Sequence, residues 1–190
     1  MNMNLVLFGP PGAGKGTQAQ SVCRNYGLGH LATGNLFRAH ISNETPLGLQ
    51  VKSILDSGEL VPDSVVLDMV KEEIQKDDFK NGVVFDGFPR TVAQAEGLEE
   101  VLNKIGLTID AFIMLDVPEE MLVQRLLSRG EGRSDDTEEK ITHRLEVYRK
   151  ETSPVKGYYE ANGHVYSILG TGSIDEVYSR IQSVLDSLRK

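Results

Sequence analysis

A glycine-rich stretch directly behind an apolar run is the feature that most constrains how this chain folds. The run is Leu5-Val6-Leu7-Phe8, which is typical of a short buried strand. The stretch is Gly9-Pro10-Pro11-Gly12-Ala13-Gly14-Lys15-Gly16-Thr17, and a helix is predicted from Gln18 to Tyr26. A strand, a Gly-(four residues)-Gly-Lys loop and a helix together indicate a phosphate-binding loop, because glycines let backbone N–H groups turn inward around an anion.

Two further features support phosphate binding by this loop, and one position departs from the usual motif. The N-terminus of the following helix offers unpaired N–H donors and partial positive charge, and Lys15 adds a full charge. Gly16 stands where the usual motif has Ser or Thr, and Thr17 follows one position later. The alternative is a glycine-rich turn that binds nothing, and the flanking strand and helix argue against it.

Length and composition narrow the class of protein. The chain has 190 residues, which fits a single domain over residues 1–190 that buries its own core. Its one cysteine, Cys23, excludes an internal disulfide and a four-cysteine zinc site, and we interpret it as an inert helix residue. The first residues lead straight into a strand, and no apolar run approaches the ~20 residues of a membrane span. We therefore expect no membrane partner and a cytoplasmic location.

The net charge of −8 argues against a nucleic-acid partner. An acidic protein that binds phosphates has to gather its cations locally. Several arginines fall near turns and helix ends beside the predicted strands: Arg38, Arg90, Arg125, Arg129, Arg133, Arg144 and Arg149. For Arg149 and Arg180 the preferred interpretation is a solvated helix position, and Arg189 is expected at the surface. No apolar amphipathic surface requires a partner, so a monomer is expected.

Short apolar segments alternate with helical ones along the chain. The predicted strands are residues 5–8, 29–32, 83–86, 111–115 and 164–169, and the helices include 33–41, 46–56, 91–104 and 174–188. The candidate helix caps are Thr33 or Asn35, Asp63, Thr137 and Ser173. This alternation predicts an α/β fold: a P-loop NTPase-type parallel sheet of about five strands with helices on both faces.

Ligands of such sheets bind at the carboxyl ends of the strands. The glycine-rich loop, Asp86, Arg90 and Asp116 each follow a predicted strand, so we expect them at one edge, although Asp116 also suits a helix cap. No strand is expected between residue 32 and the strand at 83. The segment 32–62 is therefore predicted to form a small helical insert over the site.

Four motifs resemble those of the adenylate kinases and occur in that family's order. They are Gly9 to Gln18, Thr33-Gly34-Asn35-Leu36-Phe37-Arg38, Phe85-Asp86-Gly87-Phe88-Pro89-Arg90 and Gly132-Arg133-Ser134-Asp135-Asp136. The resemblance covers essentially the whole chain. It implies a nucleoside monophosphate kinase that uses Mg²⁺, converts ATP and AMP reversibly into two ADP, and serves adenine nucleotide homeostasis.

The resemblance also implies roles for individual residues. On the ATP side these are Gly12, Ala13, Gly14, Lys15, Gly16, Thr17, Arg129 and Gly172. On the AMP side they are Thr33, Arg38, Glu59, Leu60, Val61, Gly87, Phe88, Pro89, Arg90, Gln94, Arg133 and Arg144. The residues implied to act on the transferring phosphate are Lys15, Arg90, Arg125, Arg133 and Arg144, and Asp86 is implied to hold Mg²⁺, largely through water.

Two positions depart from the family's pattern. Asn35 stands where the family usually has Asp. Only residues 130–132 separate Arg129 from Arg133, where other members carry an extra sheet, some with zinc-binding cysteines. This resembles the short-lid type, with a lid at 129–136 and no zinc.

The chemistry suits these residue types. Phosphoryl transfer needs alignment and charge stabilisation, and the accepting phosphate of AMP, with a second pKa of about 6, is already an anion near neutral pH. No general base is therefore required, while arginine forks bind phosphate oxygens two at a time. We expect the 32–62 insert and the 129–136 lid to close over the substrates and exclude water.

Two alternatives remain open. A UMP-CMP kinase would share the fold, but that family usually has Ala at the position of Thr33 and Asn at the position of Gln94. Those residues match the adenine-reading pattern, since an amide can both donate to and accept from the base. A non-catalytic nucleotide-binding switch is the second alternative, but a GTPase switch would carry an Asn-Lys-x-Asp motif, which the chain lacks.

Overall fold

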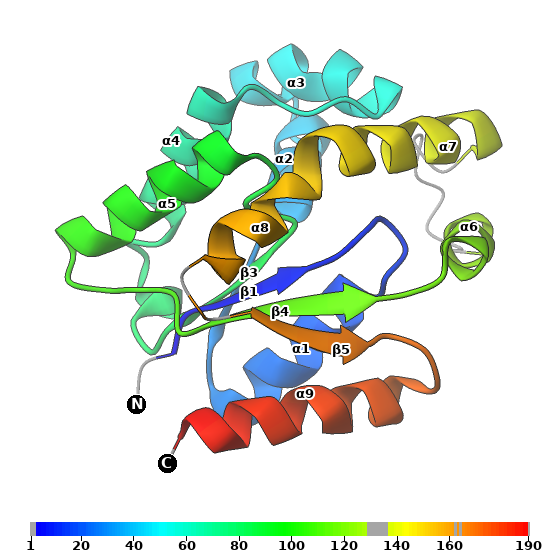
Figure 1. Ribbon diagram of the computed structural model, residues 1–190. Helices are drawn as coiled ribbons and strands as arrows, with labels where there is room; N and C mark the ends of the chain where they lie inside the picture. The colour runs from blue at the N-terminus through cyan, green and yellow to red at the C-terminus, as the bar shows by residue number, and fades with distance from the viewer. Residues whose placement is uncertain (1–2, 129–136, 162, 164, 190) are drawn as a thin grey trace.

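The computed structural model describes residues 3–128, 137–161, 163 and 165–189. These residues contain a five-stranded sheet in the order β2-β3-β1-β4-β5, and each neighbouring pair is parallel (Figure 1). The strands are β1 Leu5–Phe8, β2 Gly29–Ala32, β3 Val83–Asp86, β4 Ala111–Asp116 and β5 Val165–Leu169. The predicted α/β fold with a parallel sheet is confirmed.

Helices cover both faces of the sheet. Helices α1 (Lys15–Tyr26) and α9 (Ile174–Leu188) lie on one face, and α5 (Val92–Lys104) and α8 (Pro154–Glu160) lie on the other (Figure 1). The remaining elements are α2 Thr33–Ser42, α3 Pro46–Ser57, α4 Asp63–Glu73, α6 Glu119–Leu127, α7 Glu138–Val147, a 3-10 turn at Asp77–Phe79 and a π turn at Tyr148–Thr152. Across the described ranges, no helix is both long and apolar enough to cross a membrane.

Strand β1 is anchored by the cores on both faces. Leu5 and Leu7 belong to a hydrophobic cluster that includes residues of α1, α6 and α9. Val6 and Phe8 belong to a second cluster, which includes residues of α4, α5 and α8. None of the four is more than 3% exposed. Burial on both faces explains why the strand is a continuous apolar run, and full burial of each such side chain stabilises the fold by about 1.5–3 kcal/mol.

The register brings the carboxyl ends of β1, β3 and β4 together at one edge of the sheet. Leu7 of β1 is paired with Asp86 of β3, and Phe8 is paired with Met114 of β4. Because all pairs are parallel, the chain leaves β1, β3 and β4 on the same side of the sheet. The strand order also reverses around β1, and in open α/β sheets such a reversal marks the place where ligands bind.

The predicted helix caps are partly wrong. Ser173 caps α9 with a complete capping box, as predicted. The N-cap positions of α2 and α4 are instead Ala32 and Pro62, and neither makes a side-chain capping bond. Thr33 and Asp63 lie inside these helices, and their side chains bond to distant parts of the chain. Thr137 does occupy the N-cap of α7, but without a side-chain capping bond.

Candidate active site

The glycine-rich loop leaves β1 and enters α1 with three glycines at positive φ, namely Gly9, Gly12 and Gly14 at 143°, 84° and 93°. At Gly12 only glycine fits, because a Cβ there would stand 2.8 Å from the carbonyl oxygen of Leu122 on α6. The loop therefore packs closely against α6. This conformation suits the anion-binding loop that the sequence predicts.

The side chain of Lys15 folds back over this loop. Its Nζ donates to the carbonyl oxygens of Gly9 at 2.7 Å and Pro10 at 3.0 Å. These bonds hold the ammonium group above the loop, where an anion cradled by the backbone N–H groups would meet it. The role that the resemblance implies for Lys15 stays a prediction.

Arg125 joins the glycine-rich loop to the turn that follows β5. From α6, its Nη1 donates to the carbonyl oxygen of Ala13 at 3.4 Å, and its Nη2 donates to that of Gly170 at 3.0 Å. Gly170 follows β5 directly. One guanidinium thus ties together the two loops that are predicted to bind ATP, and Gly172 lies two residues further along as an exposed glycine with φ of 105°.

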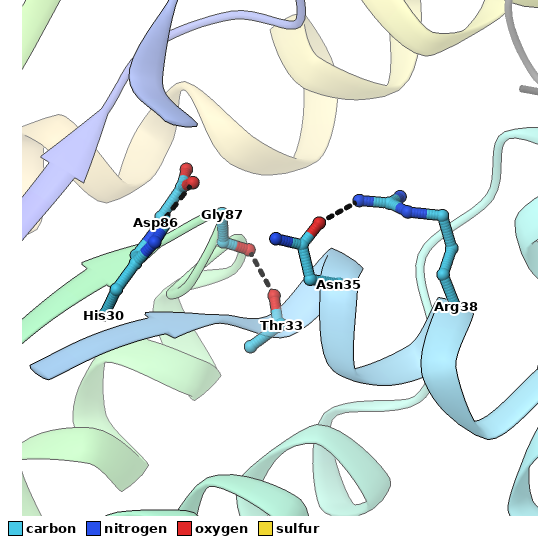
Figure 2. A network of polar contacts seen from close by, with 6 residues as sticks. All are labelled: His30, Thr33, Asn35, Arg38, Asp86 and Gly87. Carbon is cyan, nitrogen blue, oxygen red and sulfur yellow. Dashed lines mark hydrogen bonds and ion pairs between the residues drawn. The ribbon is translucent and has the colours of Figure 1, made fainter. Parts of the chain in front are cut away.

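Asp86 ends β3 beside the start of α1. Its Oδ2 lies 3.2 Å from Nε2 of His30 on β2 (Figure 2). Burial alone would raise the pKa of the Asp86 carboxyl, but the hydrogen bond from His30 and the charges of Lys15 and Arg90 together hold this pKa below its ordinary value. The carboxylate is therefore ionised near neutral pH.

This carboxylate fits a Mg²⁺ ion. Mg²⁺ in nucleotide sites is bound by one or two carboxylates together with waters and phosphate oxygens. Oδ2 of Asp86 lies 3.4 Å from the place that a Cβ on Gly16 would take, so the ionised group stands directly against the start of α1. Glycine at position 16, where Ser or Thr is usual, leaves that space open.

A pocket opens beside the end of β3, among α2, α3, α4 and the start of α5. Seven of the residues predicted for the AMP side line it: Thr33, Glu59, Leu60, Val61, Gly87, Arg90 and Gln94. Its remaining lining residues are Gly34, Phe37, Leu55 and Val66. The structure therefore brings most of the predicted AMP side to one cavity. Phe88 and Pro89 are buried beside it, and the ring of Phe88 packs against Phe85.

The carbonyl oxygen of Gly87 is a common acceptor at the base of this pocket. Thr33 donates to it from Oγ1 at 3.0 Å, and Arg90 donates to it from Nε at 2.7 Å (the Thr33 bond is drawn in Figure 2). Thr33 is only 3% exposed. These bonds fix both side chains at the wall of the pocket and aim one edge of the Arg90 guanidinium away from Gly87.

Gln94 is held by two partners and is only 1% exposed. Its Oε1 accepts from the backbone N–H of Arg90 at 2.7 Å, and its Nε2 donates to Oδ1 of Asp63 at 2.8 Å. Asp63 also accepts from Oγ1 of Thr91 at 3.0 Å. A backbone donor on one side and a carboxylate on the other fix the amide orientation, which leaves one lone pair and one N–H to read a base.

Asp63, which sequence analysis assigned to helix capping, thus holds a residue that lines the pocket. Its partners are 28 and 31 residues away along the chain, which local patterns do not reveal.

Arg38 folds back along α2 toward the pocket. Its Nη2 donates to Oδ1 of Asn35 at 2.6 Å (Figure 2). A Cβ on Gly34 would stand 3.3 Å from both terminal nitrogens of Arg38, so the guanidinium lies over Gly34, a pocket residue. Because Asn35 is neutral, this bond leaves the positive charge of Arg38 unneutralised by that partner.

Arg144 approaches the pocket from α7. Its Cγ would be 2.9 Å from a Cβ on Gly58, the residue that ends α3 at φ of 85°. The neighbouring residue His143 lies 2.7 Å from Oε1 of Glu59 through its Nε2. Helix α7 therefore meets the end of α3 beside the pocket. Arg129 and Arg133, and with them the predicted lid at 129–136, lie outside the described residues.

A family model and individual proteins of known name that are similar to this chain agree with one another. The family model for adenylate kinase matches residues 7–164. An adenylate kinase of Thermus thermophilus is 47% identical over 183 residues, which cover 95% of this chain and 96% of that protein. Adenylate kinases of Bacillus subtilis and Clostridium botulinum are each 42% identical, over 217 and 212 residues, which cover 99% and 96% of this chain and 100% and 98% of those proteins.

Proposed function

The chain belongs to the adenylate kinase family, and from this premise we propose that it transfers a phosphoryl group reversibly from ATP to AMP, giving two ADP. The observation that carries this proposal is the placement of two candidate nucleotide sites at one sheet edge. The glycine-rich loop follows β1, and the pocket opens beside the end of β3, its neighbour. Two nucleotides bound there would meet with their phosphates over β1.

The ATP side of the proposed site is the glycine-rich loop with the groups around it. The backbone of Gly12 to Thr17 and the ammonium of Lys15 would bind the phosphates of ATP. Arg125 and Arg129 would add charge, and the loop that contains Gly172 would contact the adenine. The close packing of Gly12 on α6 and the bonds of Arg125 to Ala13 and Gly170 support this arrangement, because they fix the two loops relative to each other.

The AMP side is the pocket. Thr33 and Gln94 would read the adenine, the backbone from Glu59 to Val61 would line it, and Arg38 and Arg90 would bind the phosphate. The amide of Gln94, oriented by Asp63 and by the backbone of Arg90, supports a preference for a base with both a donor and an acceptor edge. Gly87, Phe88 and Pro89 would shape the floor of this pocket.

The transfer itself would rest on position and charge. The accepting phosphate of AMP is an anion near neutral pH, since its second pKa is about 6, so no proton has to be removed from it. The cost is the repulsion between two polyanions, and Lys15, Arg90, Arg125, Arg133 and Arg144 would offset it. In related phosphoryl transfer one such arginine changes the rate by about 10³–10⁵-fold.

Mg²⁺ belongs to this proposal through Asp86. Its ionised carboxylate would hold the ion, largely through water, beside the phosphate loop. The ion, when bound, supplies charge that neutralises phosphate oxygens. The contact with His30 would keep the carboxylate pointed toward that position.

Closure is the second structural part of the proposal. Within the single domain, residues 32–62 would form an AMP-binding insert and residues 129–136 a short lid without zinc, and both would move over the substrates to exclude water. Hydrogen exchange of both segments should slow when a bisubstrate inhibitor binds. Unchanged exchange in both would contradict this part.

A monomer in the cytoplasm stays a prediction, which size-exclusion chromatography and cell fractionation would check.

A coupled assay for ADP tests the main proposal. ATP is held constant while AMP, CMP and UMP are compared as acceptors. We expect AMP to be the preferred acceptor, and a preference for CMP would favour the UMP-CMP kinase alternative instead. A protein that binds nucleotides and forms no ADP would be the non-catalytic switch. The named relatives give no support to either alternative.

A further inference from the structure

We propose that Arg180, on α9, is a positioning residue for the nucleoside triphosphate: it fixes the loop of residues 169–172 in the form that receives the base. The inference rests on the proposed function, which assigns Gly172 of this loop to the adenine of ATP. Arg180 itself lies behind the loop and touches no substrate in this scheme.

A single nitrogen of Arg180 holds the loop at two points. Nη1 donates to the carbonyl oxygen of Leu169 at 2.7 Å and to that of Thr171 at 2.7 Å. The carbonyl between them, on Gly170, accepts from Arg125 at 3.0 Å. Three consecutive carbonyl groups are thus bound by two arginines, one from α9 and one from α6.

Further bonds fix the loop before and after Gly172. The N–H of Gly170 donates to the carbonyl oxygen of Asp116 at 2.8 Å, which ties the loop to the end of β4. Beyond Gly172, Ser173 and Glu176 form the capping box of α9. Gly172, at φ of 105° and exposed, is the residue between these two sets of bonds. Its position therefore depends on how firmly Arg180 holds the carbonyls before it.

The bonds of Arg180 contribute little to the stability of the folded state. Leu169 is 55% exposed, and Thr171 is only partly buried. Water can replace Arg180 as a donor to carbonyls in such an exposed loop, so the folded state loses little when Arg180 is removed. The conformation of the loop is what water cannot restore, because separate waters do not tie two carbonyls to one point on α9.

A binding experiment separates the base from the phosphates. Arg180→Met is titrated with ATP and, in parallel, with inorganic tripolyphosphate, which has no base to place against the loop. We expect the Kd for ATP to rise about tenfold and the Kd for tripolyphosphate to stay within about twofold of the wild type. Equal rises for both ligands, or no rise for ATP, would overturn the inference.

Two further variants complete this test. Arg189→Met is the matched control, because the guanidinium of Arg189 stacks 4.3 Å from the ring centre of Tyr26, at the other end of α9, and should leave the ATP affinity unchanged. Arg180→Lys should restore most of the affinity, since one ammonium group can make both bonds that Nη1 makes. If the lysine variant binds ATP as poorly as the methionine variant, the two-carbonyl mechanism is wrong.

Kinetics keep this inference apart from the proposed function. In the ADP assay, Arg180→Met should raise the KM for ATP about tenfold while the KM for AMP and kcat stay within about twofold. A parallel change in both KM values would mean a general structural effect and would overturn the inference alone. A wild-type protein that forms no ADP would overturn the proposed function, and this inference with it.

Discussion

Nε2 of His143 lies 2.7 Å from Oε1 of Glu59, so α7 touches the residue that follows the end of α3. Both side chains are substantially exposed, at 39% and 54%. An exposed pair of this kind contributes at most about 1 kcal/mol. A contact of this strength costs little to break. In the structure the neighbouring Arg144 lies against Gly58.

Gly58→Ala should disturb that meeting point. A methyl group at φ of 85° is strained, and it would stand 2.9 Å from Cγ of Arg144, so the arginine has to move. We expect a loss of about 1–2 kcal/mol in the free energy of unfolding and about tenfold slower ADP formation. Urea unfolding and the coupled assay measure the two effects.

The control for this variant is Gly106→Ala. Gly106 has φ of 72°, and no atom beyond its own chain neighbours lies within 4 Å of its would-be Cβ. It should lose a similar free energy of unfolding through strain alone and keep its activity. If both glycine variants lose activity equally, displacement of Arg144 is not the reason.

Asp63→Ala should weaken the binding of AMP and leave the binding of ATP unchanged. Gln94 would lose its carboxylate partner and Thr91 its acceptor, so the amide that faces the pocket would no longer be held in one orientation. We expect the KM for AMP to rise about tenfold, the cost of one hydrogen bond to a charged group, with the KM for ATP unchanged. Steady-state kinetics with each substrate varied in turn measure this.

Asp63→Asn is the matched variant. Its Oδ1 can still accept from both partners, so most of the AMP affinity should return. An equal loss for both substrates in the alanine variant would show that Asp63 acts on the fold as a whole.

Lys15→Met should remove ADP formation while the fold survives. The ammonium group is the full charge held above the glycine-rich loop, where it donates to the carbonyl oxygens of Gly9 and Pro10. We expect a rate loss of about 10³-fold or more and a circular dichroism spectrum like that of the wild type. Lys52→Met, which removes an exposed lysine paired with Asp56, should keep full activity. Substantial ADP formation by the Lys15 variant would refute the role assigned to its charge.

Cys23 should react slowly as a thiol. Burial, and to a smaller extent the negative charge of Asp86, raises the pKa of this thiol to about 12. Since the thiolate is the reactive form, the fraction available near pH 8 falls by about a thousandfold from that of an ordinary thiol. Labelling with iodoacetamide should be slow in the native protein, should still be rising above about pH 10, and should become fast in urea. A reaction that levels off near pH 8.5 in the native state would show an ordinary thiol.

The parts of the fold that depend on local pattern were predictable. The loop from Gly9 to Thr17, the alternation of strands and helices and the cap at Ser173 each follow from neighbouring residues. The strand order β2-β3-β1-β4-β5 was not predicted, because apolar runs such as 83–86 and 111–115 look alike in sequence and pairing depends on how crossovers pack.

Where the structure gives polar side chains partners that the sequence did not suggest, the physical cause is the same. Asp63 precedes a helical pattern and so looks like a cap, but its acceptor oxygen is used by Thr91 and Gln94 in three dimensions. Arg180 looks like a solvated helix position, but it reaches carbonyls 9 and 11 residues away across the β5–α9 turn. Arg149, by contrast, is exposed as predicted and pairs with Glu119. Polar side chains with distant partners are the ones that sequence patterns misassign.

The central position of β1 has a consequence for protein engineering. Groups proposed to recognise the acceptor come from α2, the residues before α4, the end of β3 and the start of α5. The group proposed to contact the donor base comes from the turn after β5. The buried strand β1 thus separates the acceptor module, the groups proposed to recognise the acceptor, from the group proposed to contact the donor base. Libraries that diversify the acceptor module should retain donor preference, so each preference can be evolved in isolation and the two solutions then combined in one chain.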